Sequence, residues 1–185
     1  MIIGITGTDG AGKGTVVEYL VNEKGFVRYH ARTLFLEEIA RQELEPTRAN
    51  MRIVGNQLRG KHGNDYIVRM FLERAKESGD KHVIIDSLRA RAEAETLKTK
   101  GGILLAVDAD QKLRYERVQA RRSSSDQVSF DEFREHEELE SNDPDPHGMQ
   151  KQEVIAMADH VILNNGTLED LHALVDDFLT QYGNS

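Results

Sequence analysis

The chain has 185 residues and no cysteine, and 32 acidic against 24 basic residues give it a net charge of −8. This length suits one α/β domain with a substantial core. The lack of cysteine excludes disulfides, thiolate nucleophiles and cysteine-based metal sites. The acidic balance argues against a nucleic-acid or anionic-membrane surface. We see neither a signal peptide nor a membrane-length apolar run and therefore expect a cytoplasmic protein.

The chain begins with an aliphatic strand over residues 1–6, a glycine-rich loop from Gly7 to Thr15 and a helix over about 12–23. Glycines can take positive φ, so successive N–H groups of such a loop can point at one anion. The helix N-terminus adds partial positive charge, and Lys13 places a cation on the β and γ phosphates of a nucleotide. A plain glycine-rich turn is the alternative, but strand, spacing, lysine and helix agree. The candidate nucleotide-binding residues here are Asp9, Gly10, Ala11, Gly12, Lys13, Gly14 and Thr15.

Short helices are expected after the second strand. The strand covers 26–30, and the helices cover 33–43, 48 to about 60, and 66–76. Apolar residues at helical spacing support each helix. Helices in this place could form an acceptor-binding region over about residues 31–80. A plain helical connection between strands is the alternative.

The third strand, expected over 82–86, ends in the carboxylate of Asp86, at the edge where ligands bind in open α/β sheets. A later helix, over 112–122, carries Arg117 and Arg121 four residues apart on one face. We expect this arginine pair to reach the donor phosphates when the site closes. A solvated basic face is the alternative.

The most polar part of the chain is residues 122–150, which we interpret as a mobile lid. Ser129 begins a capping-box pattern inside it, and Thr167 begins a similar pattern before the last helix. The remaining elements are expected to be helices over 91–100, 153–158 and from 168, and strands over 103–108 and 160–163. Five alternations of strand and helix predict a three-layer α/β/α fold with a five-stranded parallel sheet, in a single domain over 1–185.

The glycine loop reads GxxGxGKGT, so Gly14 and then Thr15 follow the lysine where a general P-loop has Ser or Thr directly. This form resembles the adenylate-kinase-type nucleoside monophosphate kinases. The resemblance implies an Mg²⁺ held largely through water and phosphate oxygens, with Thr15 on the α phosphate. The run from Asp9 to Lys13 also looks like the thymidylate kinase loop, in which an acid at the Asp9 position faces the acceptor nucleotide.

The segment from Val83 to Arg89 resembles the Asp-Gly-Phe-Pro-Arg segment of the monophosphate kinases, shortened by one residue. By that resemblance Asp86 helps to hold the hydrated Mg²⁺ and Arg89 clamps the acceptor phosphate. A strand-end cap and a solvated surface arginine are the respective alternatives. Asp9 could accept a proton from an attacking hydroxyl, contact an acceptor sugar, or lie near the metal.

The C-terminal segment 158–171 looks like the corresponding end of dephospho-CoA kinases, in which the Asn-Asn-Gly turn lies beside adenine; this implies that Asn165 binds the nucleotide. With residues 44–48, these segments resemble a group of P-loop kinase-like proteins, many from archaea, and imply the P-loop NTPase fold. The sequence departs from the adenylate kinases at two positions. Thr33 stands where they have an acid, and Leu36 stands where they have the arginine that contacts AMP. Simple AMP recognition is therefore not expected.

We therefore expect an ATP- and Mg²⁺-dependent kinase for a small nucleotide-like acceptor, either a nucleoside or deoxynucleoside monophosphate or, as the second candidate, dephospho-CoA. A P-loop ATPase without a small-molecule acceptor is an alternative of another class. No nucleic-acid or membrane partner is expected, and the sequence does not indicate the oligomeric state. The expected catalytic residues are Lys13, Asp9, Arg89 and Arg121; the further nucleotide-binding residues are Arg117, Arg121 and Asn165; the expected metal-site residues are Asp86 and Thr15.

Overall fold

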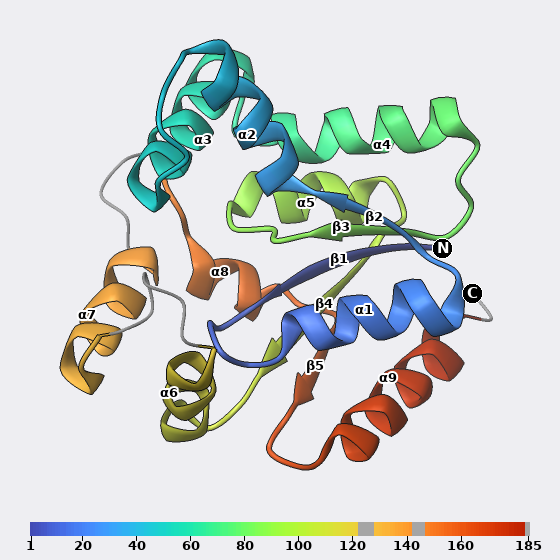
Figure 1. Cartoon of the computed structure of the whole chain (residues 1–185). Coiled ribbons are helices and arrows are strands. Elements are labelled where there is room, and N and C mark those ends of the chain that lie inside the picture. The colour runs from blue at the N-terminus through green and yellow to red at the C-terminus, as the bar shows by residue number, and fades with distance from the viewer. Residues whose placement is uncertain (122–127, 142–146, 184–185) are drawn as a thin grey trace.

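The computed structural model describes residues 1–121, 128–141 and 147–183, and shows one twisted sheet covered by helices on both faces (Figure 1). The strands are β1 Ile2–Gly7, β2 Val27–His30, β3 Val83–Asp86, β4 Ile103–Asp108 and β5 His160–Leu163. They form a five-stranded sheet in the order β2-β3-β1-β4-β5, and every neighbouring pair is parallel. The predicted three-layer α/β/α fold is confirmed.

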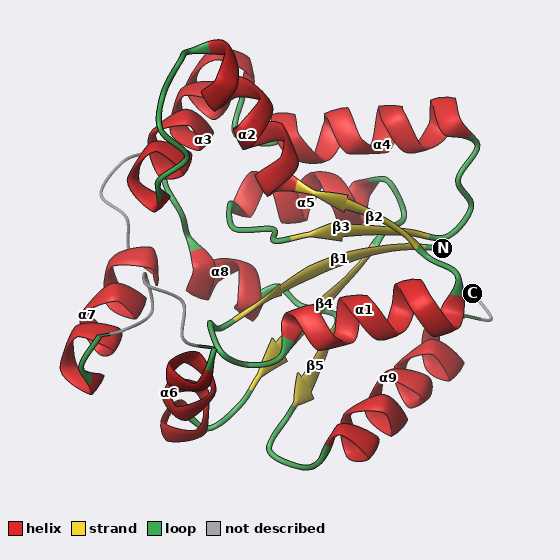
Figure 2. Cartoon of the chain, viewed as in Figure 1, coloured by secondary structure: helices red, strands yellow, loops and turns green. Residues whose placement is uncertain are grey.

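The helices of the described residues are α1 Lys13–Lys24, α2 Ala31–Arg41, α3 Arg48–His62, α4 Tyr66–Ser78, α5 Arg91–Thr99, α6 Gln111–Ala120, α7 Phe130–Ser141, α8 Lys151–Ala156 and α9 Leu168–Tyr182. Helices α4 and α5 cover one face of the sheet, and α1 and α9 cover the other (Figure 2). None of these helices is both long and apolar enough to cross a membrane.

Two predicted helices begin two residues earlier in the structure than in the sequence analysis. Helix α2 begins at Ala31 rather than Thr33, and α8 begins at Lys151 rather than Glu153. Neither has a side-chain cap at its N-terminus, so the polar capping signal that marks a helix start is missing. The two predicted capping patterns are present: Ser129 exchanges hydrogen bonds with Glu132, and Thr167 exchanges them with Asp170.

Two apolar layers hold the helices on the sheet. Leu97 of α5 packs with Ile85 on one face, and Leu20 of α1 and Phe178 of α9 pack with Ile84 on the other. Adjacent strand residues point to opposite faces, and both faces are covered. The inner strands β1, β3 and β4 are therefore mostly buried apolar runs, as predicted for the first strand, whereas the edge strand β2 carries Arg28 and His30.

The parallel arrangement brings the C-terminal ends of all strands to one edge of the sheet. Ile5 of β1 pairs with Asp86 of β3, which pairs in turn with His30 of β2, while Gly7 pairs with Val107 of β4. The glycine loop and the segment after Asp86 therefore leave the sheet side by side. This edge is where open α/β sheets bind ligands.

Candidate active site

The loop between β1 and α1 approaches its neighbours so closely that two positions require glycine. Gly7 has a φ of 130° and Gly10 a φ of 81°, both in the left-handed region. A Cβ on Gly7 would lie 2.0 Å from the Val107 carbonyl oxygen, and one on Gly10 would lie 2.4 Å from the Arg114 carbonyl oxygen. A side chain at either position would therefore force β4 or α6 away from the loop.

Lys13 is the first residue of α1, and its side chain folds over the loop. Its ammonium group donates to the carbonyl oxygens of Gly7 and Thr8, at 2.9 and 2.7 Å. It also lies 3.6 Å from Oδ1 of Asp9. The cation is thus held at the mouth of the loop, where phosphates bind in proteins with this strand, loop and helix.

Four further charged side chains share the electrostatic environment of Lys13. Burial lowers the pKa of Lys13 from 10.5 to about 8, which is the largest effect. Asp9 and Asp86 raise the pKa of Lys13, whereas Arg89 and Lys151 lower it. The segment from Asp86 to Arg89 is fixed beside the start of the loop, because Ser87 and Leu88 donate their backbone N–H groups to the carbonyl oxygen of Ile5, at 3.1 and 3.0 Å.

A pocket of about 380 Å³ opens beside the loop. It is lined by Asp9, Gly10, Gly12, Lys13, Gly14, Thr15, Glu18 and Arg121. Of the predicted arginine pair, Arg121 lines this pocket, while Arg117 donates instead to the carbonyl oxygen of Asn164, at 2.9 Å. The structure therefore brings Arg121 to the loop and uses Arg117 to brace the turn after β5.

The turn after β5 contacts the loop through Asn164 rather than through Asn165. The buried Asn164 donates from Nδ2 to the carbonyl oxygen of Ala11, at 2.8 Å. Asn165 is exposed and exchanges hydrogen bonds with Asp110 at the start of α6. The sequence marked the turn but could not show which of two adjacent asparagines points inward.

Asp86 forms an ion pair that the sequence analysis missed. Its side chain is 5% exposed, and Oδ2 accepts from Arg28 Nε at 3.0 Å and from a second Arg28 nitrogen. Ser87 donates to Oδ1 at 3.1 Å, and His30 Nε2 lies 3.7 Å from Oδ2. Burial lowers the pKa of His30, and Asp86 partly opposes that effect. Asp86 is thus held firmly at the strand end beside β2.

The side chains near the loop can be compared with the ligands that Mg²⁺ requires. In the described ranges, no three His, Cys, Asp or Glu side chains form a group that could hold a metal ion. Mg²⁺ prefers oxygen ligands and usually keeps several waters while it binds phosphates. Thr15 lines the pocket, so its hydroxyl suits a hydrated ion there, whereas Asp86 does not line it and is paired with Arg28. Their metal role stays a prediction.

Arg89 is positioned by a buried ion pair that links it to α3. The Glu93 side chain accepts from the backbone N–H groups of Arg89 and Ala90 through Oε2, at 2.9 and 3.0 Å. Its Oε1 accepts from Arg59 Nε and Nη2, at 3.1 and 2.9 Å. Glu93 is 1% and Arg59 5% exposed. The loop that carries Arg89 is therefore fixed from α3, in the predicted acceptor-binding region.

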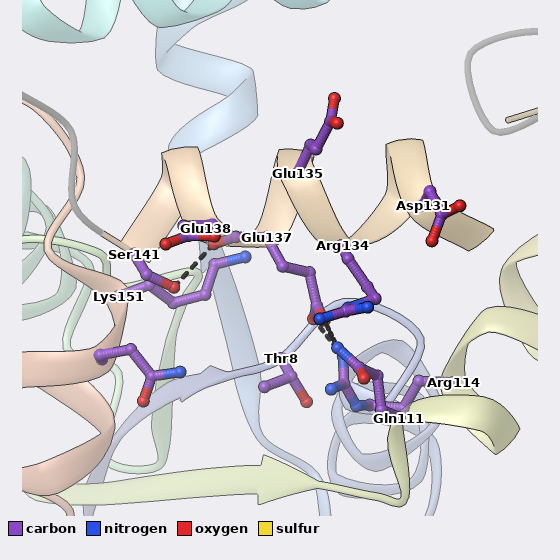
Figure 3. Close-up of a pocket in the computed structure, with 11 residues that line it drawn as sticks. Thr8, Gln111, Arg114, Asp131, Arg134, Glu135, Glu137, Glu138, Ser141 and Lys151 are labelled. Atoms are coloured by element: carbon purple, nitrogen blue, oxygen red, sulfur yellow. Dashed lines mark hydrogen bonds and ion pairs between the residues drawn. The ribbon is translucent and has the colours of Figure 1, made fainter. Parts of the chain in front are cut away.

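Two buried cations near the loop were also missed. Lys151 of α8 lies 3.4 Å from Oδ2 of Asp9. Arg114 of α6 donates to the carbonyl oxygens of Asp9 and Ala109, at 3.2 and 2.8 Å, and forms an ion pair with Glu137 of α7 (Figure 3). Lysine and arginine are mostly exposed, so no sequence signal marked these two as buried.

The predicted lid, residues 122–150, is described only in part. Helix α7 is tied to α6 through the pair of Arg114 and Glu137. Arg122 and the rest of 122–127, together with 142–146, lie outside the described residues. The lid and the acceptor-binding region stay predictions.

A parallel α/β/α sheet with a strand, a lysine-bearing glycine loop and a helix at its edge defines a P-loop NTPase with a nucleotide-binding, kinase-like fold. The chain belongs to the AAA domain family, whose model matches residues 3–143. It is 33% identical over 173 residues to a UPF0200 protein of Aeropyrum pernix, covering 92% of this chain and 88% of that protein.

Solved structures share the fold. TT1252 from Thermus thermophilus has a TM-score of 0.64 and 24% identity, over 98% of this chain and 97% of that one. A shikimate kinase from Bacteroides thetaiotaomicron has a TM-score of 0.61 and 15% identity, over 97% and 98% of the two chains. At these identities the likeness concerns the fold.

Breaking the buried pair of Arg59 and Glu93 should destabilise the protein. Arg59→Met leaves the Glu93 carboxylate buried without its cation, which typically costs about 3–5 kcal/mol of unfolding free energy. Urea unfolding followed by circular dichroism measures the change, and Arg59→Met with Glu93→Gln should recover part of it. The control Arg91→Met removes an exposed arginine, paired with Glu95, and should leave the unfolding midpoint unchanged. Equal losses in both single variants would contradict the assignment.

The lowered pKa of Lys13, about 8, predicts proton uptake when a nucleotide binds. A polyphosphate beside the ammonium group favours its charged form and so raises the pKa of Lys13. At pH 8 we expect uptake of about half a proton per Mg·ATP, falling to about a tenth at pH 7. Affinity should decline as the pH rises above 8. Calorimetric titration in two buffers of different ionisation enthalpy measures the uptake; identical binding enthalpies at pH 8 would refute it.

Proposed function

We propose that the protein is an ATP- and Mg²⁺-dependent phosphotransferase whose acceptor is a small nucleotide-like molecule. The observation that carries the proposal is an arrangement at one edge of the sheet: Lys13 lies 3.6 Å from Asp9, and the segment that carries Asp86 and Arg89 is hydrogen-bonded to the end of β1, from which the loop leaves. It combines a loop suited to the donor phosphates with an arginine suited to a second phosphate.

The chemistry needs little covalent work from the protein. The γ-phosphoryl group leaves the oxygen that bridges it to ADP and forms a bond with an oxygen of the acceptor. The loop N–H groups and Lys13 hold the donor phosphates, Arg121 adds charge from the pocket wall, and Arg89 holds the acceptor phosphate. Mg²⁺ would neutralise charge on the donor phosphates, near Thr15 and Asp86. Positioning and positive charge supply the catalysis.

The surroundings of Asp9 favour a phosphate as the attacking group. Its two carboxylate oxygens lie 3.6 Å from the Lys13 ammonium and 3.4 Å from the Lys151 ammonium. A carboxylate engaged in this way is suited to hold cations. A phosphate oxygen of a nucleoside monophosphate attacks without a base, whereas the hydroxyl of dephospho-CoA must lose a proton. We therefore favour the nucleoside or deoxynucleoside monophosphate, and dephospho-CoA is the second candidate.

An acceptor panel tests the reaction class. The protein is incubated with Mg·ATP and, separately, AMP, CMP, the deoxynucleoside monophosphates or dephospho-CoA, while ADP release is followed. We expect release that depends on one of the monophosphates, since the residue before Arg89 is hydrogen-bonded to the end of β1, from which the donor loop leaves, and Arg89 is proposed to hold the second phosphate. Equal release with and without every acceptor would identify an ATPase instead.

Two substitutions separate the donor and acceptor sides. Lys13→Ala should lower turnover by a factor on the order of 100 or more, because it removes a cation from the transferring group. Lys24→Ala, at the other end of α1, is the matched control and should retain full turnover.

Arg89→Ala should raise the KM for the acceptor more than the KM for ATP. Steady-state kinetics gives these values, and the opposite KM pattern would reverse the assignment of the two sides.

A further inference from the structure

Lys151 faces the phosphate-binding loop from a separate element. It is the first residue of α8 and is 3% exposed. Its ammonium lies 3.4 Å from Oδ2 of Asp9, and the Lys13 ammonium lies 3.6 Å from Oδ1 of the same carboxylate. One loop carboxylate thus bridges two ammonium groups, one from α1 and one from α8. Burying a lysine costs free energy because its ammonium group loses water, so the burial of Lys151 beside this loop needs an explanation.

The backbone next to Lys151 is fixed to the segment that carries Arg89. Gln150 donates its N–H to the carbonyl oxygen of Arg89, at 2.8 Å, and its side chain accepts from the N–H of Arg91, at 3.3 Å. Val154, one turn further along α8, is fully buried against the sheet. Lys151 is therefore held at a defined place between the donor loop and the acceptor-side arginine.

The ammonium group of Lys151 points into a cavity rather than into an apolar core. Figure 3 shows the side chain extending beneath α7 on the side of the cavity where Thr8 lies. The cavity has a volume of about 680 Å³, and Thr8, Arg114 and Lys151 line its inner side, whereas α7 contributes Arg134 and the carboxylates of Asp131, Glu135, Glu137 and Glu138. A ligand in this space can therefore meet the loop and the ammonium group together.

We propose that Lys151 is a catalytic residue that contacts the γ-phosphoryl group of bound ATP, on the side of Asp9 opposite Lys13. As the bond to the ADP oxygen breaks and the bond to the acceptor oxygen forms, charge on the γ oxygens is shared between the two ammonium groups. Asp9 then acts as a positioning residue for both lysines. This assignment rests on the proposed phosphotransferase function and extends it to a residue after the predicted lid.

The affinity for ATP relative to ADP tests this contact without knowledge of the acceptor. Calorimetry gives the Kd of the Mg²⁺ complexes of ADP and of the non-hydrolysable analogue with nitrogen between the β and γ phosphates. Lys151→Met should weaken binding of the analogue about 10- to 100-fold and leave the Kd of ADP within about 2-fold. The reason is that the variant loses only the charged hydrogen bonds to the γ group, which ADP lacks. Lys151→Arg, which keeps the charge, should restore part of the difference.

Controls separate this contact from a merely structural role. Lys98→Met removes another lysine paired with an aspartate, Lys98 with Asp159 at 2.7 Å, and should change neither affinity. Equal weakening of both nucleotides by Lys151→Met, or no weakening, would overturn the assignment while the proposed function stands. Wild-type protein that binds neither nucleotide would overturn both. If thermal melting shows Lys151→Met to be unfolded, Lys151→Gln, which removes the charge but keeps a polar side chain, decides, and an unchanged ratio of the two affinities refutes the contact.

Discussion

The site depends on the close approach of the loop between β1 and α1 to β4 and α6. The backbone at Gly7 and Gly10 lies so near the carbonyl oxygens of Val107 and Arg114 that no side chain fits. The same approach lets Arg114 donate to the carbonyl oxygen of Asp9. The shape of the loop, the place of α6 and the direction of Lys13 are therefore one packing arrangement, and a change at any of them would alter the others.

Charge is distributed unevenly between the surface and the site. The chain has a net charge of −8, yet Lys13 and Lys151 both approach Asp9 at one strand edge, and Gln150, next to Lys151, is hydrogen-bonded to Arg89. Basic groups within a low-dielectric cleft attract anions locally, while the acidic remainder repels large polyanions. This combination supports the proposal of a small phosphorylated ligand.

The sequence was sufficient for the features that local patterns encode. Apolar runs, helical spacing and glycines predicted the sheet and the loop, because each depends on neighbours close in the chain. The buried charges were missed because burial depends on distant partners: Glu93 is far from Arg59 in sequence, and Lys151 is farther from Asp9. Adjacent Asn164 and Asn165 could not be separated, since the direction of a side chain in a turn depends on tertiary packing.

The buried pair of Arg59 and Glu93 also limits how helices α2 and α3 can move. Kinases of this architecture often close around their substrates by rotation of whole elements. In this protein the C-terminal half of α3 is anchored to the segment that carries Arg89. A swing of α2 and α3 must therefore pivot about that anchor, so that the far end of α3 travels while Arg89 keeps its place.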